Sequence, residues 1–99
     1  MSHFTHEAIK ETLKKTILIQ GLELGDLGIR FEEITDDVVI LGEEGLALDS
    51  VDALEILSLV NRHFGIQVSE ANKEFFAAHL ASFDRLYAFV VANYKKQAA

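Results

Sequence analysis

The side chain with the clearest chemical potential is the hydroxyl of Ser50, which lies in the run Leu-Asp-Ser-Val-Asp-Ala-Leu-Glu at residues 48–55. We expect this serine at the start of a helix, close to the carboxylates of Asp49 and Asp52. A serine nucleophile needs a base within hydrogen-bond reach. His63 follows on the same expected helix at a distance of roughly 20 Å, given 1.5 Å of rise per residue. Ser50 is therefore better suited to being modified by another enzyme than to acting as a nucleophile.

Other chemistries find little support in the sequence. No Gly-x-Ser-x-Gly motif surrounds Ser50, and His3, His6 and His79 can approach it only through tertiary folding. His3 and His6 have the i, i+3 spacing of a metal-binding pair, but an exposed chain terminus explains them better. The acidic loop also lacks the alternating Asp/Asn pattern and central glycine of a calcium loop. We expect a protein that is not an enzyme and has no metal site.

The charge of the chain restricts its partners. A formal net charge of −7 disfavours nucleic acid and anionic membranes, which are bound through lysine and arginine, and favours basic proteins. Residues 22–55 hold eleven of the sixteen acids and a single base, Arg30, so the acidic region leads into Ser50. The alternative interpretation of these acids is a solvated loop whose charge only maintains solubility.

Length and composition predict one globular domain, residues 1–99. The chain is 49% hydrophobic and long enough for one modest core. It shows no signal-peptide pattern and no apolar run that could span a bilayer, which predicts a cytoplasmic protein without membrane insertion. Because it contains no cysteine, any thiol chemistry must come from an added group.

Helical spacing predicts a first helix that Thr5 caps and Gly21 ends, with an inner stripe of Ile9, Leu13, Thr16, Ile17 and Gln20. A long, glycine-rich, ordered loop follows at residues 22–48, with a short helical turn near residues 31–34. We expect several apolar side chains of this loop to pin it to the core, from among Leu27, Phe31, Ile34, Val39, Leu41 and Leu46.

The second helix should begin at Asp49 or Ser50 and end at Phe64, because Gly65 follows as a stop. At 100° per residue, its core stripe contains Ala53, Leu54, Ile56, Leu57, Val60 and Phe64. The other side combines charged and apolar residues, as a docking surface does, in Val51, Asp52, Glu55, Leu59 and Arg62. Isolated apolar residues on a helix surface are also common without any function.

Two further helices complete the expected fold. Ser69 or Asn72 can cap a short third helix, and Ser82 can cap a fourth that runs to about Tyr94. The inner stripe of the fourth helix should contain Phe83, Leu86, Tyr87, Val90 and Tyr94. The predicted fold class is all-α, a small four-helix bundle with three main helices, a short third helix and a long loop between helices one and two.

The run at residues 48–55 resembles the modification signature of acyl carrier proteins, and the order of the helices agrees with that family. The resemblance implies that Ser50 carries a covalent 4′-phosphopantetheine arm taken from coenzyme A, with Asp49 as the N-cap and Asp52 in the first turn. A phosphodiester suits this place, because a helix N-terminus favours an anion. The arm's thiol would hold acyl intermediates as thioesters for separate enzymes of fatty-acid, polyketide or other lipid synthesis.

The same resemblance implies partners and a route for the acyl chain. The partners are a phosphopantetheinyl transferase and acyl-transferring and chain-extending enzymes with basic surfaces, and the carrier is expected to be a monomer. The implied docking residues are Val51, Leu54, Glu55, Leu59 and Arg62. An acyl chain could retreat between helices two and three, where the candidate lining residues are Leu54, Leu57, Phe75 and Phe76; all four could equally fill the core.

The chain also departs from the family pattern. Asn61, Arg62 and His63 stand where many members carry acids, and Ser58 stands where an apolar contact residue is common. Ala47 replaces a frequent glycine. These differences favour specialised partners over the usual enzymes of fatty-acid synthesis. The main alternative is a helical protein-interaction module in which Ser50 is unmodified.

Overall fold

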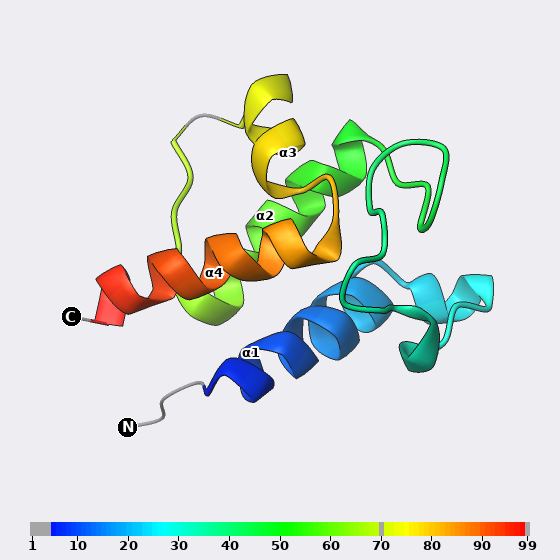
Figure 1. Cartoon of the computed structure of the whole chain (residues 1–99), viewed down its shortest axis with the longest axis horizontal. Coiled ribbons are helices and arrows are strands. Elements are labelled where there is room, and N and C mark those ends of the chain that lie inside the picture. The colour runs from blue at the N-terminus through cyan, green and yellow to red at the C-terminus, as the bar shows by residue number, and fades with distance from the viewer. Residues whose placement is uncertain (1–4, 70, 99) are drawn as a thin grey trace.

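All regular secondary structure is helical in the part of the chain that the structure describes, which is residues 5–69 and 71–98, with side chains as far as residue 94. Figure 1 shows this computed structural model. The elements are α1 (His6–Glu11), the π-helical segment η1 (Thr12–Gly21), the 3₁₀ turns η2 (Leu24–Leu27) and η3 (Phe31–Glu33), α2 (Ser50–Phe64), α3 (Lys73–His79) and α4 (Phe83–Ala98). Since α1 continues directly into η1, the two form one helix, named helix 1. The predicted all-α bundle with a short third helix and a long loop before α2 is confirmed.

Short polar side chains and a glycine fix several helix ends at the predicted places, whereas α4 runs to Ala98, beyond its predicted end near Tyr94. The hydroxyl of Thr5 accepts a hydrogen bond from the Ala8 N–H (3.0 Å). Of the two candidate caps for α3, Asn72 is the one in use, and its side chain accepts from the Phe75 N–H (2.9 Å). Each oxygen satisfies a backbone donor that the first helical turn leaves unpaired. At the other end of α2, Gly65 has φ = 71°, a left-handed conformation in which glycine avoids the steric cost of a Cβ.

Helix 1 departs from the predicted stripe in its second half. The N–H of Leu22 bonds to the carbonyl oxygen of Ile17 (3.1 Å), five residues back, as in a π-helix. This wider winding changes the angle between successive side chains. Ile17 and Leu18 are both fully buried, whereas Gln20, which we expected on the inner stripe, is exposed. The prediction for Gln20 is wrong because a 3.6-residue period does not hold through η1.

Helix α2 packs closely on the end of helix 1 at Gly21. A Cβ at Gly21 would overlap the side chain of Leu59, which is only 5% exposed. Leu54, predicted in the core stripe, is instead 52% exposed. The two leucines lie about 140° apart around α2. Leu59 is on the side that helix 1 covers, and Leu54 is therefore on a side that helix 1 leaves exposed. The rest of the predicted stripe is confirmed as buried: Ala53, Ile56, Leu57, Val60 and Phe64.

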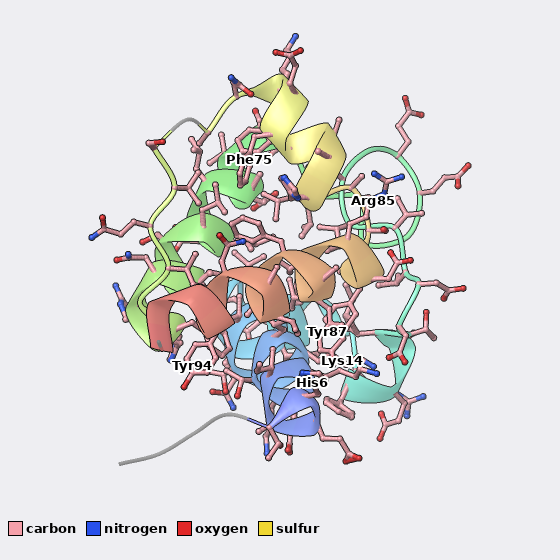
Figure 2. All side chains as sticks on the ribbon, turned by 60° about the vertical axis from the view of Figure 1, so that its left-hand side comes forward. His6, Lys14, Phe75, Arg85, Tyr87 and Tyr94 are labelled. Atoms are coloured by element: carbon pink, nitrogen blue, oxygen red, sulfur yellow. The ribbon has the colours of Figure 1, made fainter. Side chains whose placement is uncertain are left out.

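Phe83, the first residue of α4, contacts both helix 1 and the loop within the core. This side chain is fully buried, and its N–H donates to the carbonyl oxygen of Val38 (2.9 Å). Its ring stacks on Tyr87 with 6.4 Å between centroids, and the ammonium of Lys14 lies 5.2 Å from its centroid. Figure 2 labels Lys14 and Tyr87 together with His6, whose ring meets that of Tyr87 edge-on with 6.2 Å between centroids. On the predicted inner stripe, Leu86 and Val90 are also buried, Tyr87 and Tyr94 are half-buried, and Phe89 is an additional core residue.

Residues 22–48 lie against the bundle and are tied to it at several points. Val39 forms an isolated antiparallel β-bridge with Ser82, whose hydroxyl donates to the carboxylate of Asp84 at the start of α4. Leu41 forms a parallel bridge with Leu48, just before α2. Among the residues predicted to pin the loop, Ile34 and Leu46 are buried and Leu41 is half-buried, but Leu27, Phe31 and Val39 are exposed. The predicted turn near residues 31–34 is confirmed as η3, while η2 was not predicted.

A pair of lysines connects helix 1 to this loop through one carboxylate. Asp36 accepts hydrogen bonds from the ammonium groups of Lys14 (2.8 Å) and Lys10 (3.0 Å). The hydrogen bonds from Lys14 and then from Lys10 hold the pKa of Asp36 below its ordinary value of 3.8. The hydrogen bond to Asp36 raises the pKa of Lys10 above its ordinary 10.5. The bridge is therefore strongest over the pH range in which all three groups are charged.

We expect Asp36→Asn to destabilise the protein in a pH-dependent manner. Because the folded pKa of Asp36 is depressed, its contribution is present above pH 3.8 and is lost as the pH falls through the folded value. Because the folded pKa of Lys10 is raised, its contribution is present below pH 10.5 and is lost as the pH rises through the folded value. Urea unfolding should be measured from below pH 3.8 to above pH 10.5. The difference in free energy of unfolding between wild type and Asp36→Asn should become smaller at both ends of this range.

Asp37→Asn is the matched control for this experiment. It removes the same charge from the neighbouring position, where the carboxylate accepts from the Thr35 hydroxyl (2.9 Å), and it leaves the lysine bridge intact. A difference between wild type and Asp36→Asn that stays constant from acid to alkali would contradict the ion-pair explanation.

Candidate functional site

Ser50 is the first residue of α2, and its side chain is exposed. The helix start is held by a reciprocal pair of hydrogen bonds between its neighbours. The carboxylate of Asp49 accepts from the Asp52 N–H (3.1 Å), and the carboxylate of Asp52 accepts from the Asp49 N–H (3.1 Å). The hydrogen bond from the Asp52 N–H is the main cause that lowers the pKa of Asp49, which keeps this cap charged. The predicted N-cap and first-turn acid are therefore confirmed, and they place the Ser50 hydroxyl at the N-terminal end of a 15-residue helix.

The segment before Ser50 is fastened to the preceding part of the loop. The N–H of Leu48 donates to the carbonyl oxygen of Ile40 (2.9 Å), and the N–H of Gly42 donates to the carbonyl oxygen of Leu48 (3.1 Å). Leu48 is 8% exposed and so anchors the chain two residues before the serine. In Figure 1 the start of α2 lies on the opposite side of the bundle from both chain ends, where the loop returns to the helices. Ser50 therefore has a defined position on the surface.

Two residues of this segment have left-handed backbone conformations that shape the approach to α2. Gly45 has φ = 62° and Ala47 has φ = 54°. The glycine itself signals such a conformation in the sequence, but an alanine does not. Ala47 therefore bears the steric cost of a Cβ in this conformation, which a glycine would avoid. Neither residue was predicted to position Ser50.

The exposed side of α2 next to Ser50 combines apolar and charged side chains. Val51 is 71% exposed and Leu54 is 52% exposed, and Glu55 and Arg62 are exposed on the same helix. Leu59, predicted as a docking residue, is buried against helix 1 at Gly21, so that prediction is wrong. The available surface of α2 is therefore apolar near Ser50, acidic at its first turns and basic near its C-terminus, where Arg62 and His63 lie.

The four predicted pocket residues are divided between two grooves and the core. Leu54 and Leu57 line a groove of about 460 Å³ between α2 and the segment that follows it, together with Ile66 and Val68. Phe75 lines a different groove of about 530 Å³ with Phe89 and Asn93 of α4. Phe76 is 8% exposed and borders neither groove. Gln67 and Val68 border both grooves.

The histidines and acids of the described residues form no cluster of three that could hold a metal ion. His63 is exposed near the far end of α2, and the ring of His79 lies beside those of Phe75 (4.7 Å) and Phe89 (5.0 Å), which also contact each other (5.2 Å). His3, one of the two histidines considered as a metal-binding pair, lies outside the described residues. Chemically, the start of α2 offers an exposed hydroxyl beside carboxylates and the positive end of a helix.

Comparisons with protein-family models, with curated proteins and with solved structures found no match to this chain. Over the residues that the structure describes, no helix has the length and apolar character needed to cross a membrane. The interpretation of the site therefore depends on its own residues and geometry.

Proposed function

We propose that this protein is an acyl carrier whose Ser50 bears 4′-phosphopantetheine. The observation that carries the proposal is the exposed hydroxyl of Ser50 at the first position of α2, between the two aspartates of the reciprocal cap. An attached phosphodiester would lie at the positive end of the helix dipole, close to backbone N–H groups of the first turn. The absence of cysteine from the chain makes an added thiol necessary for thioester chemistry.

The modification is a phosphoryl transfer that a separate transferase catalyses. The oxygen of the Ser50 hydroxyl forms an ester bond with the phosphorus that carries pantetheine in coenzyme A. The pyrophosphate bond breaks, 3′,5′-adenosine diphosphate leaves, and the hydroxyl proton passes to a base of the transferase. The thiol at the end of the arm then accepts acyl groups as thioesters and presents them to acyl-transferring and chain-extending enzymes.

The exposed side of α2 supports this proposal as a docking surface. Asp49, Asp52 and Glu55 supply negative charge that orients a partner with a basic surface, and Val51 and Leu54 supply apolar contact beside the attachment point. The groove along Leu54 and Leu57 begins one helical turn from Ser50, and it is the proposed path for an arm or acyl chain that folds back onto the protein. Arg62 and His63 would favour partners other than those of a uniformly acidic carrier.

We expect the purified protein to gain the mass of one phosphopantetheine when it is incubated with coenzyme A and a broad-specificity phosphopantetheinyl transferase. Intact-mass spectrometry measures this gain directly. Ser50→Ala should show no gain, because it removes the only atom to which the arm is attached. Ser58→Ala is the matched control, since this serine is exposed on the same helix and should be dispensable.

Two results would contradict the proposal. One is an unchanged wild-type mass under conditions in which an established carrier is fully labelled. The other is a mass gain in Ser50→Ala that equals the gain in wild type. The first result would favour an unmodified interaction module, and the second would place the attachment at another residue.

A further inference from the structure

The exposed face of α2 carries an acid and a base on one line along the helix. Glu55 and Arg62 are both exposed, and at 100° per residue they lie about 20° apart around the helix axis. The rise of the helix separates them by roughly 10 Å along that axis. Among the described residues, neither side chain forms an ion pair. Both charges are therefore available to a partner that lies along α2.

This face is continuous and has its apolar contact at one end. Within an arc of about 140° around the axis, bounded by Ser50 and Glu55, every residue of α2 is exposed. Val51 and Leu54, which are 71% and 52% exposed, lie in its first turns, and the small side chain of Ser58 lies between the acid and the base. A partner aligned with the helix meets apolar side chains, then an acid, then a base.

The position of Arg62 has an alternative explanation in the helix itself. A cation anywhere in the last turn interacts favourably with the helix dipole, and that turn contains both Arg62 and His63. The dipole accounts for a base in this turn but not for its place on the exposed face. His63 lies about 100° further around the axis, beyond the buried Leu59. Arg62 alone brings positive charge to the face that holds Glu55.

The order of the side chains indicates what kind of partner fits. A uniformly basic surface would set a cation against Arg62, and opposed like charges cost energy. A second copy of the chain fits poorly, because both copies carry −7. A two-fold pair that sets Glu55 against Arg62 of the other copy would also hold the Val51 and Leu54 pairs at opposite ends, where they do not meet.

We propose that α2 selects partner proteins with a bipolar docking surface, which places a basic side chain opposite Glu55 and an acidic side chain opposite Arg62. Arg62 is then a specificity-determining residue that attracts this acid and repels a uniformly basic surface. The proposal rests on the docking role proposed for the exposed side of α2, but it does not depend on modification of Ser50.

The test uses two fluorescent amphipathic helical peptides with identical rows of leucine. The basic peptide has lysine throughout its polar side, and the mixed peptide has lysine in one half and glutamate in the other. Binding is followed by fluorescence anisotropy at about 0.15 M ionic strength, where the screening length is about 8 Å and distant charges contribute little. The measured quantity is the ratio of the two dissociation constants, which reports the preference between the peptides.

We expect Arg62→Glu to shift this preference towards the basic peptide at least about threefold, because an attraction to the glutamate half becomes a repulsion. Arg62→Gln should give a smaller shift in the same direction, without an acid in the last turn. Lys15→Glu is the matched control, since it changes the net charge equally at an exposed position on helix 1 and should shift the preference less than about 1.5-fold. Circular dichroism establishes that every variant retains its helices.

Val51→Ser/Leu54→Ser should weaken the binding of both peptides, because they share the apolar contact. The proposal is overturned if this variant binds both peptides as wild type does, or if Lys15→Glu shifts the preference as much as Arg62→Glu, which would make net charge the cause. Absence of wild-type binding to either peptide counts against it too. Sedimentation that shows a wild-type dimer dissociated by Arg62→Glu would assign the face to a second copy instead. Since no arm is attached in these measurements, failure here is distinguishable from failure of the labelling experiment.

Discussion

Gly45→Ala is expected to lower the free energy of unfolding by about 2–5 kcal/mol and to disturb the path of the chain that leads to Ser50. A left-handed backbone costs an L-residue roughly 1–2 kcal/mol, and Gly45 has φ = 62°. Its new Cβ would also overlap the carbonyl oxygen of Val39 and lie 2.9 Å from the carbonyl carbon. Such forced displacement in a packed structure typically costs about 1–3 kcal/mol more.

The displaced carbonyl has a structural role in the site. The carbonyl oxygen of Val39 accepts a hydrogen bond from the N–H of Leu46 (2.9 Å), which is part of the path from the loop to α2. Gly45→Ala should therefore slow the proposed transfer of phosphopantetheine to Ser50 as well as weaken the fold. Urea unfolding measures the first effect, and a time course of intact mass measures the second.

Gly65→Ala is the matched control for Gly45→Ala. Gly65 has nearly the same conformation, φ = 71°, but a Cβ there would meet no atom within 4 Å. This substitution should therefore show only the backbone cost of roughly 1–2 kcal/mol. Equal destabilisation by the two alanines would mean that the contact with Val39 has no energetic consequence, which would contradict the explanation.

Phe83→Ala is expected to destabilise the protein by about 3–5 kcal/mol, the typical cost of deleting a buried aromatic ring. Phe83 is fully buried where α4, helix 1 and the loop meet. Its ring stacks on Tyr87 and lies under the ammonium of Lys14, which also pairs with Asp36. Removing the ring leaves a cavity and withdraws contacts from three parts of the fold at once. Denaturant unfolding of wild type and Phe83→Ala, compared at equal m-value, gives the difference in their free energies of unfolding.

Phe31→Ala removes the same ring from the surface and serves as the control. Phe31 is 43% exposed, and its ring is also close to Lys14, with 5.8 Å between the ammonium and the centroid. We expect a loss below about 1 kcal/mol, as for most changes away from the core. A loss from Phe31→Ala that matches that of Phe83→Ala would show that burial is not what makes Phe83 important.

The helix boundaries could be predicted because their causes are local in the sequence. Thr5, Asn72 and Asp49 cap backbone N–H groups only three residues away, and Gly65 ends α2 through its own conformational freedom. The predicted position of Ser50 at the first residue of α2 depends on the same local chemistry. Its attachment to a cofactor remains a proposal that the labelling experiment tests.

The buried side of a helix could be predicted only where two conditions were met. The 3.6-residue period had to hold, and only one side of the helix could be apolar enough to pack on the core. Leu54 and Leu59 are equally apolar, and nothing local determines which of them faces helix 1. Gly21 decides it, because the absence of a side chain there lets Leu59 approach. Gln20 was assigned wrongly because η1 winds as a π-helix, which the apolar spacing does not reveal.

The sequence by itself determined that the chain is helical, where helix 1 and α2 begin and end, and that Ser50 stands in an acidic region at a helix start. These properties follow from capping, glycine and periodicity, which act within a few residues. Tertiary structure alone decided that Leu54 is exposed and Leu59 buried, that Phe75 and Leu57 line different grooves, and that Leu27 and Phe31 stay on the surface. The reason is that burial depends on which other elements pack alongside, and contacts between residues distant in the sequence leave little trace in local patterns.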